Sequence, residues 1–294
     1  MNTLTIFTPS FNRAHLLPIL YESLCNQTCQ DFEWLIIDDG STDNTKALVS
    51  VWIAENKVPI TYIHQENQGM HGAHNTAYKN IQTKLNTCID SDDYIPLNAV
   101  DLILTKWYSI DQKKYAGIIG LDALESGAII GSKFTTDSTT LEDFYLSGGS
   151  GDKKLVYRTD VITSYPEYPI FEGERYVGLG TKYLFVDKDY ELVTLNEVLV
   201  IVNYQPQGSS NTMFYQYMKN PKGFIYNRIT TMKYSKSTKR KFVESIHYVS
   251  SCLILKRMNF FKESPEKFLT LLSVPFGVVL YLFIIYKNKK QNFA

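Results

Sequence analysis

The sequence predicts an α/β protein with a mostly parallel sheet and helices on both of its faces. Two observations predict it. Short apolar, β-branched runs alternate with segments of helical spacing through the first hundred residues. Polar clusters follow these apolar runs where each of them ends. Strands that alternate with helices of this length form βαβ units, and ligands bind such sheets at the carboxyl ends of the strands.

The elements can be placed along the chain by their apolar periodicity. The expected strands are 4–9, 33–40, 60–65 and 86–93, and the expected helices between them are 14–28, 43–55 and 72–85. Asp43 or Asn44 is the expected N-cap of the second helix. The second half is less regular, with strands expected at 116–123 and 190–204. From about residue 224 the pattern becomes helical and basic.

Composition limits the class of protein. The chain has 294 residues, of which 44% are hydrophobic, enough for the core of one large domain with an appendage. The four cysteines have no CxxC spacing, so we expect neither a zinc site nor a disulfide framework. The first ten residues lack the basic and apolar regions of a secretory signal, and a cytoplasmic location is expected.

The net charge of zero hides an asymmetry between the two parts of the chain. Residues 1–224 hold 17 Lys and Arg against 27 Asp and Glu, whereas 225–294 hold 13 against 3. A basic tail indicates an anionic partner, either membrane lipid or nucleic acid. The acidic main part argues against nucleic acid as the substrate, because it would repel phosphates. We therefore predict a catalytic domain at 1–224, with halves 1–96 and 97–224, and a membrane-associating region at 225–294.

The sharpest chemical signal is CIDSDDY at 88–94, where Asp90, Asp92 and Asp93 follow an apolar run. Carboxylates this close repel one another unless a cation neutralises them, and hard oxygen ligands suit Mg²⁺ or Mn²⁺. In an extended segment Asp90 and Asp92 would point to one side and Asp93 to the other. The alternative is a solvated acidic turn that caps a helix starting near Pro96.

Three further polar clusters follow predicted strands. TPSFNR at 8–13 offers Ser10, Asn12 and Arg13 to a base or a diphosphate. In IIDDGSTDNT at 36–45, Asp39 could accept a hydrogen bond from a nucleotide base, and the alternative for the rest of the turn is plain helix capping. In ENQGMHGAHN at 66–75 two glycines permit close backbone approach to a ligand. A metal pair of His71 and His74 is not expected, since no third ligand is evident nearby.

TPSFNR, LIIDDGSTDNT, NQGMHGAHN and CIDSDDY, in this order and at these intervals, resemble the family 2 glycosyltransferases of GT-A fold. The resemblance covers residues 1–96 closely. Further segments resemble the branch that assembles bacterial capsule and surface polysaccharides: GDKKLVYRTD at 151–160, YPIFEGERYV at 168–177, YQPQGSSN at 204–211 and KNPKG at 219–223. The resemblance implies a GT-A sheet, a nucleotide-sugar donor, Mn²⁺ or Mg²⁺ as cofactor, and inversion at the anomeric carbon.

The resemblance also implies roles for single residues. Asp39 corresponds to the carboxylate that reads the uracil or other base. Asp90-Ser91-Asp92 corresponds to the DxD metal motif, with Asp92 as the more direct ligand, and Asp93 replaces or assists it. Glu174 falls where relatives place the catalytic base, often an Asp, and Glu172 is its rival. The implied nucleotide-sugar contacts are Thr8, Pro9, Ser10, Asn12, Arg13, Asp39, Asn67, Gly69, Asn75, Asp90, Ser91 and Asp92.

The uncharged run FLTLLSVPFGVVLYLFIIY at 268–286 is long enough to span a bilayer. Pro275 and Gly277 would break or kink such a span, and lysines flank both of its ends. We expect a kinked helix lying on the cytoplasmic face of the membrane, where a lipid-linked glycan acceptor would share the surface. A buried helix packed on the main domain and a spanning helix are the alternatives.

Two other functions fit parts of the pattern. A nucleotidyltransferase also uses carboxylate-held Mg²⁺ on an α/β sheet, but residues 8–13 do not supply the Gly-rich basic loop that it would need. The second alternative is a non-catalytic nucleotide-sugar-binding protein, for instance a partner subunit. Donor hydrolysis by the purified protein would separate it from an enzyme.

Overall fold

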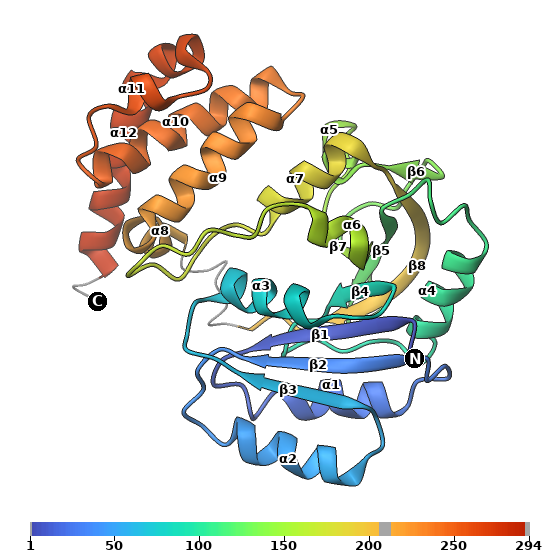
Figure 1. Ribbon diagram of the computed structural model, residues 1–294. Coiled ribbons are helices and arrows are strands. Elements are labelled where there is room, and N and C mark those ends of the chain that lie inside the picture. Colours follow the sequence, from blue (N-terminus) through green and yellow to red (C-terminus); the bar gives the residue numbers. More distant parts are fainter. Residues whose placement is uncertain (1, 206–212, 292–294) are drawn as a thin grey trace. The chain divides into compact units, whose positions relative to one another are not determined.

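The computed structural model describes residues 2–205 and 213–291, and its chain divides into two compact units (Figure 1). The sheet unit comprises Met1–Glu167 and Asp189–Gln205, and the helical unit comprises Tyr168–Lys188 and Pro206–Ala294. The sequence predicts a boundary near residue 224; among the described residues, 168–188 and those from 213 onward group with the C-terminal helices.

Within the described residues, eight strands form one sheet in the order β3-β2-β1-β4-β7-β5-β8-β6. The strands are β1 (Leu4–Ser10), β2 (Phe32–Asp38), β3 (Ile60–His64), β4 (Leu85–Cys88), β5 (Gly117–Leu124), β6 (Ser138–Thr139), β7 (Lys153–Arg158) and β8 (Leu192–Val202). All the strands predicted from apolar runs are present. The strand predicted at 86–93 ends at Cys88, so the acidic run follows it rather than lying within it.

Strand directions decide which residues meet at one edge. β1 pairs in parallel with β2 and β4, and β2 with β3. β7 is antiparallel to both β4 and β5, so β5 runs in the direction of β4, and β8 is parallel to β5. The carboxyl ends of β1 to β5 and β8 therefore share an edge with the amino end of β7. The polar clusters of the sequence lie at this carboxyl edge.

Helices cover both faces of the sheet, as predicted. The sheet unit contains α1 (Leu17–Cys25), α2 (Thr45–Glu55), α3 (Met70–Asn80), α4 (Ala99–Tyr108), α5 (Leu141–Leu146) and α6 (Thr159–Ser164). Side chains of a strand point alternately to the two faces. Thus Leu4 and Ile6 of β1 pack in one core with residues of α1, α2 and α4, whereas the Phe7 ring lies edge-on to His74 of α3. In Figure 1, α3 lies on the side of β1–β3 opposite to α2.

The helical unit is built around a smaller core. Its helices are α7 (Gly180–Asp189), α8 (Met213–Lys219), α9 (Pro221–Tyr234), α10 (Thr238–Ile254), α11 (Phe260–Glu263) and α12 (Lys267–Gln291). Ile225 and Met232 of α9 pack against Tyr248 and Cys252 of α10. The helical pattern predicted from about residue 224 is therefore present, and α9 begins at Pro221.

Helix α12 buries small residues and exposes large apolar ones. Gly277 lies so close to α10 that a Cβ there would be 2.6 Å from Val249 Cβ, and the small side chains of Thr270 and Ser273 are fully buried. The exposed side chains are large and apolar: Phe268, Leu271, Leu272, Phe276, Val278, Val279, Leu282, Phe283 and Tyr286. Pro275 lies inside this helix without ending it. In length and apolar composition Lys267–Lys289 qualifies as a membrane span.

Candidate active site at the carboxyl edge of the sheet

The acidic run forms a turn after β4. The backbone N–H of Asp93 donates to the Asp90 carbonyl over 3.1 Å. The segment is therefore not extended, and Asp92 is a central residue of the turn, so the alternation expected for an extended segment does not apply here. Asp93 is buried, and its Oδ1 accepts a hydrogen bond from the Asn203 backbone N–H at 3.0 Å. The turn is thus tied to the end of β8.

The carboxylates of this turn repel one another. Burial, followed by the negative charge of Asp90, raises the pKa of Asp93 to about 7, and the Lys154 ammonium opposes this rise. Burial and Asp90 also raise the pKa of Asp92, which the Arg13 guanidinium opposes. Ionising all the carboxylates of this turn is therefore energetically unfavourable unless a cation is bound.

Asp39 is held firmly by the loop between β3 and α3. Its Oδ1 accepts hydrogen bonds from Gln65 Nε2 at 2.7 Å and from the Gln68 N–H at 2.8 Å, while Oδ2 accepts from the Gly69 N–H at 2.8 Å. Gly69 has φ 82°, a left-handed conformation that favours glycine, and it precedes the first turn of α3. A buried carboxylate in this network fixes the loop that carries Asn67.

The segment after β1 is joined to the turn after β2. Asn12 has a left-handed φ of 55°, and its Oδ1 accepts from the backbone N–H groups of Thr42 at 2.8 Å and Asp43 at 3.3 Å. The Asn12 N–H donates in return to Ser41 Oγ at 2.8 Å. Asn12 therefore links the segment after β1 to the turn after β2 at the carboxyl edge of the sheet.

The other predicted contact residues on the carboxyl side differ in their surroundings. Thr8 Oγ1 accepts a hydrogen bond from Trp34 Nε1 at 3.0 Å inside the core. Pro9 and Ser10 are the last two residues of β1, and Ser10 Oγ is buried with no partner among the described residues. Ser91 is buried within the acidic turn, and Asn75 is buried in α3.

Two charged residues at this edge were missed from the sequence. Asp122 lies near the end of β5 and is 4% exposed. Lys154 lies at the start of β7, where its Nζ donates to the Cys88 carbonyl at 2.9 Å. Asp122 interrupts an apolar run that continues with Ala123 and Leu124, so it lacks the strand-end position that marks Asp39 and Asp90 in the sequence. Lys154 sits in the quoted GDKK segment, but its direction toward the acidic turn depends on antiparallel pairing.

The Glu174 carboxylate lies at the amino end of α9, within the helical unit. Oε1 accepts from the Lys222 N–H at 3.0 Å and Oε2 from the Gly223 N–H at 2.8 Å. The Arg175 N–H donates to Asn220 Oδ1 at 2.7 Å, so the FEGER and KNPKG segments bind each other. Glu174 is buried and Glu172 is exposed. The YQPQGSSN motif lies mostly outside the described residues.

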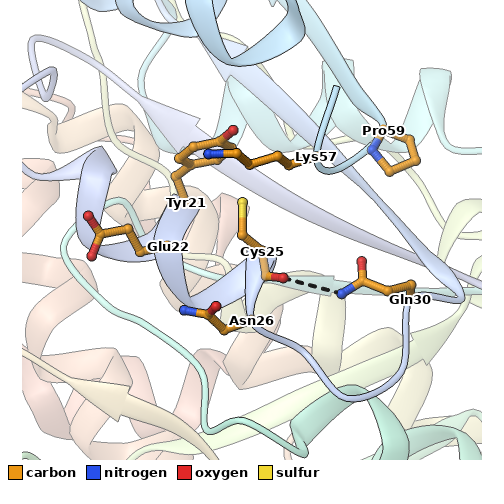
Figure 2. A pocket seen from close by; sticks show the side chains of 7 residues that line it. All are labelled: Tyr21, Glu22, Cys25, Asn26, Gln30, Lys57 and Pro59. Atoms are coloured by element: carbon orange, nitrogen blue, oxygen red, sulfur yellow. Dashed lines mark hydrogen bonds between the residues drawn. The ribbon is translucent and has the colours of Figure 1, made fainter. Parts of the chain in front are cut away.

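A hollow of about 680 Å³ in the sheet unit lies away from this edge (Figure 2). It is lined by residues at the ends of α1 and α2 and just before β2 and β3: Tyr21, Glu22, Cys25, Asn26, Gln30, Lys57 and Pro59. Because these residues precede the strands, the hollow lies at the amino edge. Burial raises the pKa of the Cys25 thiol, which disfavours the reactive thiolate.

In the parts of the chain that the structure describes, no three His, Cys, Asp or Glu side chains are grouped so as to hold a metal ion by themselves. The donor set nevertheless fits a hard divalent cation, since it consists of carboxylates whose repulsion a cation would relieve. Such ions often use one or two carboxylates and take their other ligands from phosphates and water.

In open, mostly parallel α/β sheets, ligands bind at the carboxyl ends of the strands, where these carboxylates and glycine loops lie. Residues 5–120 match the model of Glycosyl transferase family 2. The resemblance predicted from the four motifs is confirmed.

Curated relatives are bacterial glycosyltransferases. Chondroitin synthase of Escherichia coli is 35% identical over 103 residues, which are 35% of this chain and 15% of that protein. The GalNAc(5)-diNAcBac-PP-undecaprenol beta-1,3-glucosyltransferase of Campylobacter jejuni is 25% identical over 170 residues, which are 55% of this chain and 53% of that protein. The chain thus spans about half or less of the length of these relatives.

Solved structures confirm the GT-A fold. S. aureus TarS in complex with UDP-GlcNAc superposes with a TM-score of 0.64 at 15% identity, covering 92% of this chain and 79% of that one. The mannosyltransferase PcManGT of Pyrobaculum calidifontis, in complex with GDP-Man and Mn²⁺, has a TM-score of 0.55 at 14% identity, covering 95% and 86%.

Proposed function

We propose that this protein transfers a sugar from a nucleotide sugar, most simply a UDP-sugar, to a hydroxyl group of a glycan acceptor in bacterial surface polysaccharide synthesis, with inversion. The observation that carries the proposal is the turn of Asp90, Asp92 and Asp93 at the carboxyl edge of a family 2 domain. Burial, followed by the negative charge of Asp90, raises the pKa of both Asp92 and Asp93. A bound cation with a diphosphate is the ligand that this charge fits.

In this mechanism the residues of the sheet unit bind and orient the donor. Asp90 and Asp92 would hold Mn²⁺ or Mg²⁺, with Asp93 assisting, and the metal would supply stabilisation of the charge on the departing nucleoside diphosphate. Asp39 would bind the nucleotide base. Hydrogen bonds from Gln65, Gln68 and Gly69 hold its carboxylate in one orientation.

We propose Glu174 as the general base that takes the proton of the acceptor hydroxyl. Two backbone N–H donors hold its carboxylate in one orientation and use about half of its acceptor positions. A fixed, accepting carboxylate is what a general base requires. Glu172 is the rival, because it lies two residues away and is exposed.

We further propose that α12 binds the cytoplasmic face of the membrane and that the acceptor is lipid-linked. The apolar side chains of α12 point outward, while Lys267 and Lys287 at its ends are also exposed. Small residues such as Gly277 at the contact with α10 are typical of helices that pack within lipid. A helix lying in the interface places both lysines at the headgroups. The relative from Campylobacter jejuni, named for an undecaprenol-linked acceptor, supports this choice.

The test is a screen of UDP-, GDP- and dTDP-sugars for release of the nucleoside diphosphate by the purified protein. We expect metal-dependent release from one class of donor, because many transferases hydrolyse their donor slowly when no acceptor is present. A protein that binds a nucleotide sugar but never cleaves it, with or without glycan acceptors, would be a binding subunit instead.

A further inference from the structure

Asp122 is a buried carboxylate without a hydrogen-bond donor at one oxygen. Within the described residues its Oδ1 has no partner, although the residue is 4% exposed. Burial raises the pKa of this carboxyl group, and the nearby Lys154 charge opposes the rise. An unpaired buried oxygen destabilises the folded state, so folding alone does not explain a carboxylate at this position and a role in ligand binding does.

Topology places Asp122 on the same face of the sheet as Lys154. Gly120 of β5 pairs with Lys154 of β7, and paired residues of antiparallel strands point to the same face. Asp122, two residues after Gly120, shares that face. The pairing of β5 with β8 shifts register between Leu121 and Asp122, and the extra residue lies on β8, between Val198 and Val200, so the alternation along β5 is kept.

The two charges influence each other without touching. Lys154 has a raised pKa: burial opposes the rise, and the negative charges of Asp122 and Asp90 outweigh it. Yet no ion pair of 4.0 Å or less joins Asp122 to a described Lys or Arg. The hydrogen bond of Lys154 Nζ to the Cys88 carbonyl uses one of its three donors. Asp122 and Lys154 therefore lie on one face of the sheet and interact electrostatically, and Asp122 Oδ1 has no hydrogen-bond partner within the described residues.

Exposed aromatic rings border this place. Tyr204, 60% exposed, donates from its hydroxyl group to Asp152 Oδ2 at 3.4 Å, and Tyr145, 41% exposed, donates to the Gly151 carbonyl at 3.0 Å. Both rings lie near Asp122, because its negative charge helps to raise their pKa values after burial and the charge of Asp152. Tyrosine rings combine an apolar face with a polar tip, which suits the C–H faces and hydroxyl groups of a sugar.

We propose that Asp122 and Lys154 form the subsite for the sugar ring of the donor, with Asp122 Oδ1 accepting a hydrogen bond from a sugar hydroxyl group and Lys154 Nζ donating one to another sugar oxygen. The inference rests on the proposed function. The sugar is attached to the β-phosphate, and the turn that would hold the diphosphate interacts electrostatically with Lys154 through Asp90 and Asp93. A second cation is disfavoured there because the ammonium group already provides positive charge.

The test compares binding of a nucleotide sugar with binding of its nucleoside diphosphate alone, by calorimetry with Mn²⁺ present. The probes are UDP-GlcNAc and UDP, or the pair that the wild type hydrolyses fastest. Asp122→Asn should weaken binding of the nucleotide sugar by roughly 5- to 100-fold and leave that of the diphosphate unchanged. Glu125→Gln, an exposed carboxylate-to-amide change just past β5, is the matched control.

Stability separates this role from a structural one. Because the unpaired carboxylate is costly, Asp122→Asn and the apolar Asp122→Leu should both raise the melting temperature of the ligand-free protein while weakening sugar binding. Unchanged affinity for the nucleotide sugar in both variants, or an equal loss for the diphosphate alone, would overturn the proposal. If the wild type binds no nucleotide sugar at all, the proposed function fails first, which is a distinguishable outcome.

Discussion

The Gly223 backbone N–H donates a hydrogen bond of 2.8 Å to Glu174 Oε2 at the first turn of α9. A Cβ on Gly223 would lie 1.9 Å from the Tyr176 carbonyl oxygen, so only glycine permits this close approach. The residue proposed as the base is thus also an anion bound at a helix N-terminus, where the helix dipole favours negative charge. Its two roles make separate predictions.

Glu174→Gln should lower turnover by about 10²–10⁴-fold, since the amide cannot take a proton. It should also destabilise the protein by about 1–3 kcal/mol, because the amide NH₂ cannot accept one of the two backbone hydrogen bonds. Rates and unfolding free energies measured on the same samples separate the two effects.

Glu172→Gln is the control, being exposed and in the same segment. It should leave turnover and stability near wild type. If Glu172→Gln loses turnover at full stability while Glu174→Gln loses only stability, the base is Glu172 and Glu174 serves the fold.

Asp39→Asn should weaken nucleotide binding by on the order of 1.5–3 kcal/mol, the value of a hydrogen bond to a charged group. Asp39→Ala should weaken nucleotide binding further, since it also removes the acceptor of the hydrogen bonds from Gln65, Gln68 and Gly69 of the loop. Calorimetry with UDP, GDP and dTDP measures both. Asp43→Asn is the matched control, because Asp43 also accepts backbone N–H bonds, from Ala14 and Thr45. An equal loss in Asp43→Asn would show that loop order, and not base contact, sets the affinity.

Asp93 predicts an unusual pH dependence for the metal-free protein. Its folded pKa is about 7, whereas an unfolded Asp titrates near 4. Between these pH values the folded state holds a proton that the unfolded chain has released, so stability falls as pH rises, on the order of 1.4 kcal/mol per pH unit for this group. Thermal melts from pH 5 to 8 should show a smaller fall in Asp93→Asn. Identical slopes in the two proteins would contradict the assignment.

The outward face of α12 should govern membrane binding. Replacing Leu271, Val279 and Leu282 with Glu should reduce binding to phosphatidylglycerol-containing vesicles at least about tenfold, as apolar burial is lost. Val51→Glu with Ile53→Glu, on exposed positions of α2, is the control. Deleting 262–294 is a less specific test, because it also exposes the surface of α10 against which Gly277 packs. Resistance of the wild type to extraction by salt and alkali would instead indicate a spanning helix.

The periodicity of the first hundred residues was sufficient to predict β1–β4 and α1–α3, because buried parallel strands and amphipathic helices have distinct apolar spacing. The turn of Asp90–Asp93 was left open as an alternative to an extended segment, since local sequence does not show where a short strand ends. Asp122 and Lys154 were missed for another reason: only the antiparallel insertion of β7 between β4 and β5 brings them to one face of the sheet. The contact of Glu174 with α9 joins segments about 50 residues apart, which no local pattern reveals.

The most direct test of the central claim is nucleoside diphosphate release from the preferred nucleotide sugar, measured for wild type, Asp92→Asn and Asp111→Asn with Mn²⁺ and with EDTA. Asp111 is an exposed carboxylate in the loop after α4 and serves as the control. The account predicts release by wild type and Asp111→Asn with Mn²⁺, none in EDTA, and a loss of at least about 10²-fold in Asp92→Asn at unchanged melting temperature. Full activity in EDTA after thorough metal removal, or a fully active Asp92→Asn protein, would contradict it.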